Sequence, residues 1–194
     1  MILGITGGSG SGKTTLLKLI EANGGVILDC DAIYHRLLRD DKDLLQAIEA
    51  RFPGTVIDGQ LDRKKLGEVV FADEAALLEL NSITHGAVKR EVLRVLDTKP
   101  AHAAIDAIAL FESGLDDLCD ATVSISAPEE MRIRRLMARE GISYDYAQKR
   151  IGAQHPDDWY REKCTYTLVN DGTLDAFRAK CIAFLQRLGI METE

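Results

Sequence analysis

The fold of this chain is decided by residues 2–14, which read ILGITGGSGSGKT. The apolar run 2–6 is typical of a buried parallel strand, and it stops at glycines. Residues 7–14 fit the pattern G-x-x-x-x-G-K-[ST], in which glycines allow successive backbone N–H groups to turn toward one anion. A helix that starts near Lys13 adds the positive end of its dipole at the same place. The pattern therefore predicts a phosphate-binding loop between a strand and a helix.

We expect this loop to bind ATP together with Mg²⁺. Lys13 is expected to contact the β- and γ-phosphates, and the Thr14 hydroxyl is expected to ligate the magnesium ion. Glycine-rich turns also occur without a ligand, but the strand before and the helix after this turn favour nucleotide binding. The predicted ATP-binding residues of the loop and the first helical turn are Gly8, Ser9, Gly10, Ser11, Gly12, Lys13, Thr14 and Thr15.

The rest of the chain continues an alternation of strands and helices. Periodicity and turn residues predict strands at 26–28, 103–110, 121–125 and 166–169, a long helical region at 32–96, and helices at 13–23, 128–139, 143–153 and 173–188. These elements predict an α/β fold of the P-loop NTPase type, a three-layer sandwich with a five-stranded parallel sheet. One helical insertion follows the second strand, and a second, basic one follows the fourth. We therefore expect a nucleotide-binding core of residues 1–31, 99–127 and 164–194, with one insertion of residues 32–98 and a second of residues 128–163.

The composition excludes several other classes of protein. With 24 basic and 31 acidic residues, the net charge of −7 argues against a broad nucleic-acid surface. The four cysteines are widely spaced and form no CxxC pair, which favours reduced thiols over a zinc or redox site. The N-terminus lacks the features of a signal peptide, and no apolar stretch is long enough to span a bilayer. We expect a cytoplasmic protein without a membrane or nucleic-acid partner.

Two carboxylates follow the second predicted strand, at the edge of the sheet where ligands bind. Either Asp29 or Asp31 is a candidate to accept the proton of a substrate hydroxyl. Alternatively, Asp31 only caps the next helix, and the spacing alone does not decide between these roles.

A run of arginines opens the basic insertion, and three of them, Arg132, Arg135 and Arg139, share one helical face. A face of unpaired arginines suits a flap that closes over phosphates, whereas a solvated surface helix is the alternative. Because the chain also contains a predicted phosphate loop, a flap is favoured over a solvated surface helix. Arg150 and Gln154, on the following helix, are candidates for the same flap.

Other polar residues have less specific patterns. Asp106 lies within an apolar run and Glu112 follows it, so either is a candidate to reach the magnesium shell through water. Alternatively, Asp106 is a structural hydrogen-bond acceptor. His35 and His85 are isolated, which from the sequence alone favours packing or surface positions.

Together these features resemble the dephospho-CoA kinase family, which carries out the last step of coenzyme A biosynthesis. No single motif beyond the phosphate loop is specific, but the order and spacing of the motifs along the chain are. The matching segments are Gly4 to Thr14, Asp29-Cys30-Asp31, Gly59 to Arg63 with Leu66 and Val70-Phe71, Leu80 to His85, Asp106 through Glu112, the lid residues Arg135, Arg139, Ala147, Arg150-Ile151 and Gln154, and Asn170-Asp171-Gly172.

The resemblance implies ATP- and magnesium-dependent phosphorylation of the ribose 3′-hydroxyl of dephospho-CoA, with Asp31 as the general base. It implies catalytic roles for Lys13 and Arg139 as well, and contacts of Arg135, Arg139 and Asn170 with ATP. It also makes residues 32–98 a helical acceptor-binding domain and residues 128–163 a helical lid. The expected substrate-binding residues are Asp31, His35, Arg63, His85 and Glu112, and the expected assembly is a monomer or a weak homo-oligomer.

Four segments depart from the family's usual residues. Ser9 stands where Ile is usual, Gly86 where a proline follows the histidine, Ile108-Ala109 where Pro-Leu is usual, and Cys164-Thr165 where Ala-Asp is common. These four departures affect the predicted acceptor site more than the predicted ATP site.

Two other functions fit part of the pattern. A nucleoside or nucleoside-monophosphate kinase shares the phosphate loop and the arginine flap. Residues 59–71 and the early Asp-x-Asp, however, favour a dephospho-CoA kinase. A non-catalytic ATP-binding regulatory protein has no need for Asp31 or the flap arginines.

Overall fold

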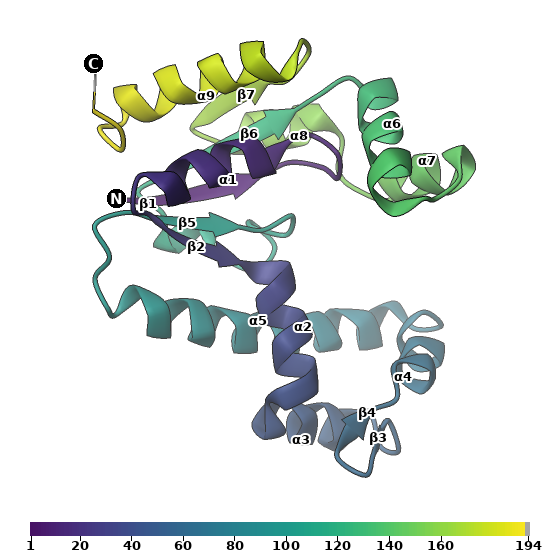
Figure 1. The fold of residues 1–194 in the computed structure, drawn as a ribbon. Coiled ribbons are helices and arrows are strands. Elements are labelled where there is room, and N and C mark those ends of the chain that lie inside the picture. The colour runs from purple at the N-terminus through teal and green to yellow at the C-terminus, as the bar shows by residue number, and fades with distance from the viewer. Residues whose placement is uncertain (193–194) are drawn as a thin grey trace. The chain divides into compact units, whose positions relative to one another are not determined.

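The structure is a computed structural model that describes residues 1–192. The chain divides into two compact units, one formed by residues 1–28 and the chain from Pro100 onward, the other by residues 29–99. The first unit contains the sheet and the phosphate loop, and the second is mainly helical (Figure 1). None of the helices within residues 1–192 is long and apolar enough to cross a membrane.

The central sheet has five parallel strands, which confirms the predicted fold class. The strands are β1 (Ile2–Thr6), β2 (Val26–Asp29), β5 (Ala103–Asp106), β6 (Ala121–Ser126) and β7 (Tyr166–Val169), and their order is β2-β5-β1-β6-β7. β1 lies in the middle and pairs with β5 on one side and β6 on the other. The residues of β1 are therefore hydrogen-bonded on both sides, which makes it a rigid base for the loop that follows.

The strand predicted at 103–110 is shorter in the structure, because β5 ends at Asp106. The Ala107 N–H still bonds to Ile5 O at 3.1 Å, but the next residues coil into turns closed by bonds such as Leu115 N–H to Leu110 O at 3.1 Å. The apolar residues that lengthened the prediction are buried without being extended: Leu110 has no exposed surface. An apolar run alone does not separate a strand from a buried turn.

One face of the sheet is covered by α1 (Lys13–Ala22) and α9 (Leu174–Arg187), which pack against each other (Figure 1). The core on this face joins Leu3 and Ile5 of β1 to Leu16 of α1 and Phe177 of α9. On the other face, a side chain at Gly4 would lie 2.8 Å from Cys119 Sγ, so the segment after β5 packs directly on the β1 backbone. The phosphate loop thus leaves a strand that is packed on both faces.

Three helices of this unit connect β6 to β7: α6 (Glu129–Glu140), α7 (Tyr144–Gly152) and α8 (Asp157–Lys163). A short 3-10 helix, η1 (Asp116–Leu118), precedes β6. α6 and α7 pack together through Ile133, Leu136, Ala147 and Ile151, and α6 ends at Gly141, whose φ of 68° is favourable for glycine. The helices predicted at 128–139 and 143–153 are confirmed, whereas α8 was not predicted.

The second unit contains α2 (Cys30–Asp40), α3 (Lys42–Arg51), the hairpin strands β3 (Val56–Ile57) and β4 (Gln60–Leu61), α4 (Arg63–Val70) and α5 (Glu74–Leu96). Each of its helices begins after an aspartate whose side chain accepts a hydrogen bond from a nearby backbone N–H; these caps are Asp29, Asp41, Asp62 and Asp73. The 23-residue α5 packs against α2, α3 and α4. Side-chain caps at every start define where these helices begin.

An ion-pair cluster in this unit predicts a pH-dependent loss of stability. Glu91 on α5 bonds to Arg94 at 2.8 Å and to Arg36 of α2 at 2.6 Å. The hydrogen bond from Arg94, assisted by Arg36, lowers the pKa of Glu91 from 4.5 to about 2. Because the folded pKa lies below the unfolded one, the stabilisation is present above pH 4.5 and is lost as the pH falls toward 2.

We expect Glu91→Gln to lower the midpoint of thermal unfolding at pH 7 by about 2–4 °C. The difference from the wild type should shrink as the pH falls from 4.5 toward 2, when the wild-type carboxylate is protonated as well. Thermal unfolding followed by circular dichroism across this pH range measures the difference in midpoint. Glu68→Gln on α4 is the control for loss of an exposed carboxylate. A pH-independent difference would contradict the electrostatic origin of the effect.

Candidate functional site

The phosphate loop, residues 7–14, joins β1 to α1 as the sequence predicts. Three of its glycines have left-handed backbone angles: φ is 127° at Gly7, 78° at Gly10 and 106° at Gly12. A side chain at Gly7 would also lie 2.2 Å from the carbonyl oxygen of Ile125. Both the conformation and the close approach of β6 therefore require glycine.

The N-terminus of α1 is open to an anion. Among residues 1–192 no side chain caps this helix, and its first turn contains no acidic residue. Lys13, its first residue, donates a hydrogen bond from Nζ to Gly7 O at 2.8 Å, which keeps the ammonium group over the loop. Backbone N–H groups, a helix dipole and one lysine converge here, and this combination fits a polyphosphate chain.

The same loop has features that fit a magnesium ion held together with phosphate oxygens. Thr14 is exposed in the first turn of α1, where its hydroxyl is accessible. Asp106 is half-buried and pairs in the sheet with Ile5, beside the end of β1. Within residues 1–192 no group of three or more His, Cys, Asp or Glu side chains is arranged to hold a metal. Magnesium commonly uses one or two protein ligands with substrate phosphates and water, and Thr14 with Asp106 fits that pattern.

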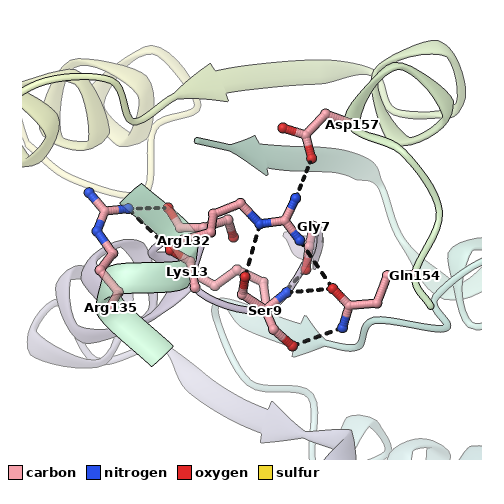
Figure 2. Close-up of polar contacts among 9 residues, drawn as sticks. Gly7, Ser9, Lys13, Arg132, Arg135, Gln154 and Asp157 are labelled. Atoms are coloured by element: carbon pink, nitrogen blue, oxygen red, sulfur yellow. Dashed lines mark hydrogen bonds and ion pairs between the residues drawn. The ribbon is translucent and has the colours of Figure 1, made fainter. Parts of the chain in front are cut away.

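The carbonyl groups of the loop are held by side chains from the segment 128–163. Arg132 of α6 donates from Nε to Ser9 O at 2.9 Å, as Figure 2 shows. Gln154, which follows α7, binds Ser9 twice: its Oε1 accepts from the Ser9 N–H at 2.9 Å and its Nε2 donates to Ser9 Oγ at 2.8 Å. Asp157 of α8 pairs with Arg132 at 3.1 Å. Ser9, at the tip of the loop, is thus hydrogen-bonded through its N–H, its C=O and its hydroxyl.

Arg135 and Asn170 hold the next carbonyl groups. Arg135 donates to Gly10 O at 3.1 Å and Ser11 O at 3.3 Å, and to the Asn170 side chain at 3.2 Å. Asn170, directly after β7, is buried and donates to Ser11 O at 2.8 Å. The structure therefore brings two of the predicted ATP-binding residues, Arg135 and Asn170, onto the loop itself.

The expectation of an unpaired arginine face is wrong. Arg132 is 5% exposed and paired with Asp157, while Arg139 is exposed and bonds to Glu140 at 2.6 Å. Arg150, from α7, bonds to the same Glu140 at 2.5 Å. The pairs Arg132–Asp157 and Arg150–Glu140 join different helices, so the spacing of the arginines along the chain does not reveal them. Of this set, Arg139 and Arg150 have exposed guanidinium groups that share one carboxylate.

An aromatic cluster lies beside this network. His155 stacks on Trp159, with ring centroids 3.8 Å apart, and pairs with Glu112 at 2.9 Å. Phe111 meets the Trp159 ring edge-on, and Lys163 lies over both aromatic rings. The cluster connects the segment after β5 to α8, whose first residue is Asp157. Asp157 and Trp159 were missed from the sequence, because α8 was not predicted.

The structure also separates the two early aspartates by role. The Asp29 side chain accepts a hydrogen bond from the Ala32 N–H at 2.9 Å and caps α2. Asp31 is an exposed residue of the first helical turn. The alternative in which Asp31 caps the helix is therefore wrong, and Asp31 keeps its place as the candidate base.

A cavity of about 230 Å³ lies within the unit of residues 29–99. Two of the predicted substrate-binding residues line it, His35 of α2 and Arg63 of α4, together with Tyr34, whose pKa is raised by burial although Arg63 opposes the shift. The remaining walls are mostly apolar: Leu38, Leu61, Leu66, Gly67, Val70, Phe71 and Leu80. His85, half-buried on α5, does not line this cavity, and Glu112 belongs to the other unit.

Comparisons with known sequences identify one family. A sequence model described as dephospho-CoA kinase matches residues 1–176. The dephospho-CoA kinase of Corynebacterium diphtheriae is 33% identical over 192 residues, which are 96% of each chain. That of Thermus thermophilus is 35% identical over 189 residues, 97% of this chain and 92% of the relative.

Solved structures agree with these matches. A crystal structure from Thermus thermophilus has a TM-score of 0.80 and 34% identity, and the match covers 97% of each chain. A dephospho-CoA kinase from Campylobacter jejuni has a TM-score of 0.68 at 26% identity, with 98% of each chain covered. A shikimate kinase from Bacteroides thetaiotaomicron, 18% identical with a TM-score of 0.53, shares the fold.

Proposed function

The chain belongs to the dephospho-CoA kinase family, and we propose that it transfers the γ-phosphoryl group of ATP to the ribose 3′-hydroxyl of dephospho-CoA. The products are coenzyme A and ADP, which makes this the final step of coenzyme A biosynthesis. The observation that carries the proposal is a complete phosphate loop with an uncapped helix end, in a chain that matches the family model over residues 1–176.

The residues of the loop neutralise the charge of the triphosphate. Lys13 shifts from Gly7 O to the β- and γ-phosphates, while the loop N–H groups bind the remaining oxygens. A magnesium ion, when bound, would offset the charge of the phosphate oxygens; the Thr14 hydroxyl would be one of its ligands, and Asp106 would act through water. Arg139 exchanges Glu140 for a phosphate oxygen of ATP.

Asp31 orients the attacking hydroxyl and accepts its proton. It lies one helical turn before His35 on α2, so the two side chains share a helix face, and His35 lines the cavity of the same unit. That cavity, with Arg63 at its wall and apolar residues around it, suits an acceptor with a charged group and an apolar body. We include His85 and Glu112 among the acceptor contacts on the strength of the family pattern.

The proposal also covers the cellular location, the assembly and the domain division of the protein. We place it in the cytoplasm, as a monomer or a weak homo-oligomer. All four cysteines are free thiols in the structure, which is the state expected in a reducing compartment. The sheet core 1–31, 99–127 and 164–194, the acceptor domain 32–98 and the lid 128–163 are the divisions by which we assign these roles.

A coupled assay of ADP release tests the substrate. Purified protein with ATP and Mg²⁺ should release ADP only when dephospho-CoA is added, and the product should carry one additional phosphate on the ribose by mass spectrometry and phosphorus NMR. Nucleosides and nucleoside monophosphates should give turnover at least about 100-fold lower, because they lack the pantetheine arm of dephospho-CoA and the binding energy that it supplies. Faster turnover on a nucleoside would replace the proposal with the rival kinase, and ATP binding without transfer would favour a regulatory protein.

A further inference from the structure

Arg132 is a cation buried within the protein. Its side chain is 6% exposed, and its three nitrogens have three different partners. Nε donates to Ser9 O at 2.9 Å, one terminal nitrogen to Asp157 Oδ1 at 3.1 Å, and the other to Gln154 Oε1 at 3.1 Å (Figure 2). A buried charge is tolerated when it is paired and hydrogen-bonded in this way.

The loop and α6 are in direct contact around this side chain. A Cβ atom added at Gly8 would lie 2.0 Å from a terminal nitrogen of Arg132, and one added at Gly10 would lie 2.7 Å from the Arg132 carbonyl oxygen. The guanidinium group therefore forms a wall of the loop. Gln154 joins the wall, since its Oε1 accepts both from Arg132 and from the Ser9 N–H at 2.9 Å.

Fixing the carbonyl groups also fixes the N–H groups of the loop. In a trans peptide the C=O of one residue and the N–H of the next point in opposite directions. With Ser9 O held by Arg132, the Gly10 N–H points away from α6. With Ser11 O held by Arg135 and Asn170, the Gly12 N–H points away from those residues. The side chains on the outside of the loop thus set the direction of the donors on its inside.

We infer that Arg132 is a positioning residue for nucleotide binding: held by Asp157 and Gln154, it fixes the Ser9 peptide so that the loop N–H groups are preorganised for phosphate. The Ser9 hydroxyl strengthens this anchor, because it accepts a bond from Gln154 Nε2 at 2.8 Å that an isoleucine would not make. In this chain Arg132 acts through the loop backbone and not as a lid arginine on the phosphates. The kinetic part of the test uses the proposed reaction, whereas the binding part needs only ATP.

Arg132→Met removes the three donors while keeping a long side chain. We expect the Kd for Mg·ATP, measured by titration calorimetry, and the KM for ATP to rise by about tenfold or more, as displacement of a preorganised group by a fraction of an ångström would cause. The KM for dephospho-CoA should stay within about twofold, because the change does not touch the acceptor. Arg132→Lys should recover only part of the affinity, since the single nitrogen of an ammonium cannot reach three acceptors that now bond to three separate guanidinium nitrogens.

Arg134→Met is the matched control, because Arg134 lies on the same helix with an exposed side chain. It should leave ATP affinity and turnover within about twofold of the wild type.

The double variant Arg132→Met/Asp157→Asn separates positioning from simple stability. Arg132→Met alone leaves a half-buried carboxylate without its cation, and removing that charge should recover much of the lost thermal stability. If Arg132 positions the loop, ATP affinity stays low in the double variant although stability returns. If affinity returns together with stability, or if Arg132→Met binds Mg·ATP like the wild type, the inference is wrong. Normal ATP binding without transfer to dephospho-CoA in the wild type would instead contradict the proposed function and leave this inference standing.

Discussion

Replacing Lys13 with methionine should lower kcat/KM by about 1,000-fold, the effect expected when the principal cation on the transferred phosphoryl group is lost. In the structure Lys13 already lies over the loop, with Nζ 2.8 Å from Gly7 O. No other lysine lies in the loop or at the start of α1, and the two arginines that contact the loop, Arg132 and Arg135, are bonded to its carbonyl oxygens. The ADP-release assay with saturating dephospho-CoA measures the loss.

Lys18→Met provides the control for this prediction, because Lys18 is an exposed residue of the same helix. It should retain turnover within about twofold. Circular dichroism should show that both variants are folded, so that the loss belongs to the site. Turnover of Lys13→Met within tenfold of the wild type would mean that another cation neutralises the phosphates.

Asp31→Asn should lower kcat by about 100-fold or more while leaving the Kd for Mg·ATP nearly unchanged, as expected for a positioned general base. Asparagine preserves the size of the side chain but cannot accept the proton. Because Asp29 and not Asp31 caps α2, the substitution should also leave the helix intact. Single-turnover kinetics report the chemical step, and titration calorimetry reports the affinity for ATP.

Asp40→Asn removes an exposed carboxylate at the other end of α2 and should leave kcat within about twofold. Asp29→Ala should have a different signature, a loss of stability of about 1 kcal/mol from the missing helix cap. If Asp31→Asn turns over like the wild type, the base must be a different group.

The sequence predicted best those parts of the fold whose conformation is determined locally. The strand at 2–6, the glycine loop and the helix from Lys13 are encoded by adjacent residues with strong preferences. The predicted end of β5 was wrong, because the residues after Asp106 are apolar yet coil into turns. α8 was missed because its seven residues are few and mostly charged, too short a stretch to show a periodic apolar face.

The candidate site was predicted by residue type but not by pairing. Arg132, Arg135, Gln154 and Asn170 were all singled out, yet the arginines were expected to be unpaired. Their partners come from distant parts of the chain: Asp157 lies 25 residues after Arg132, and Asn170 lies 35 residues after Arg135. Contacts across such separations depend on how α6, α7 and α8 pack, which no local pattern encodes. The cap of α2 was ambiguous for the opposite reason, since Asp29 and Asp31 are so close that both fit the pattern.

The chain has a single tryptophan, and its indole ring stacks on His155 in the segment that leads from Gln154 to α8. We expect the emission of Trp159 to respond to small displacements of this segment, because the His155 imidazole and the Lys163 ammonium both lie against its ring. Because Gln154 and Arg132 connect the segment to the backbone of the phosphate loop, nucleotide uptake should change that emission without any added dye. Trp159 should therefore report nucleotide occupancy even in variants that have lost turnover.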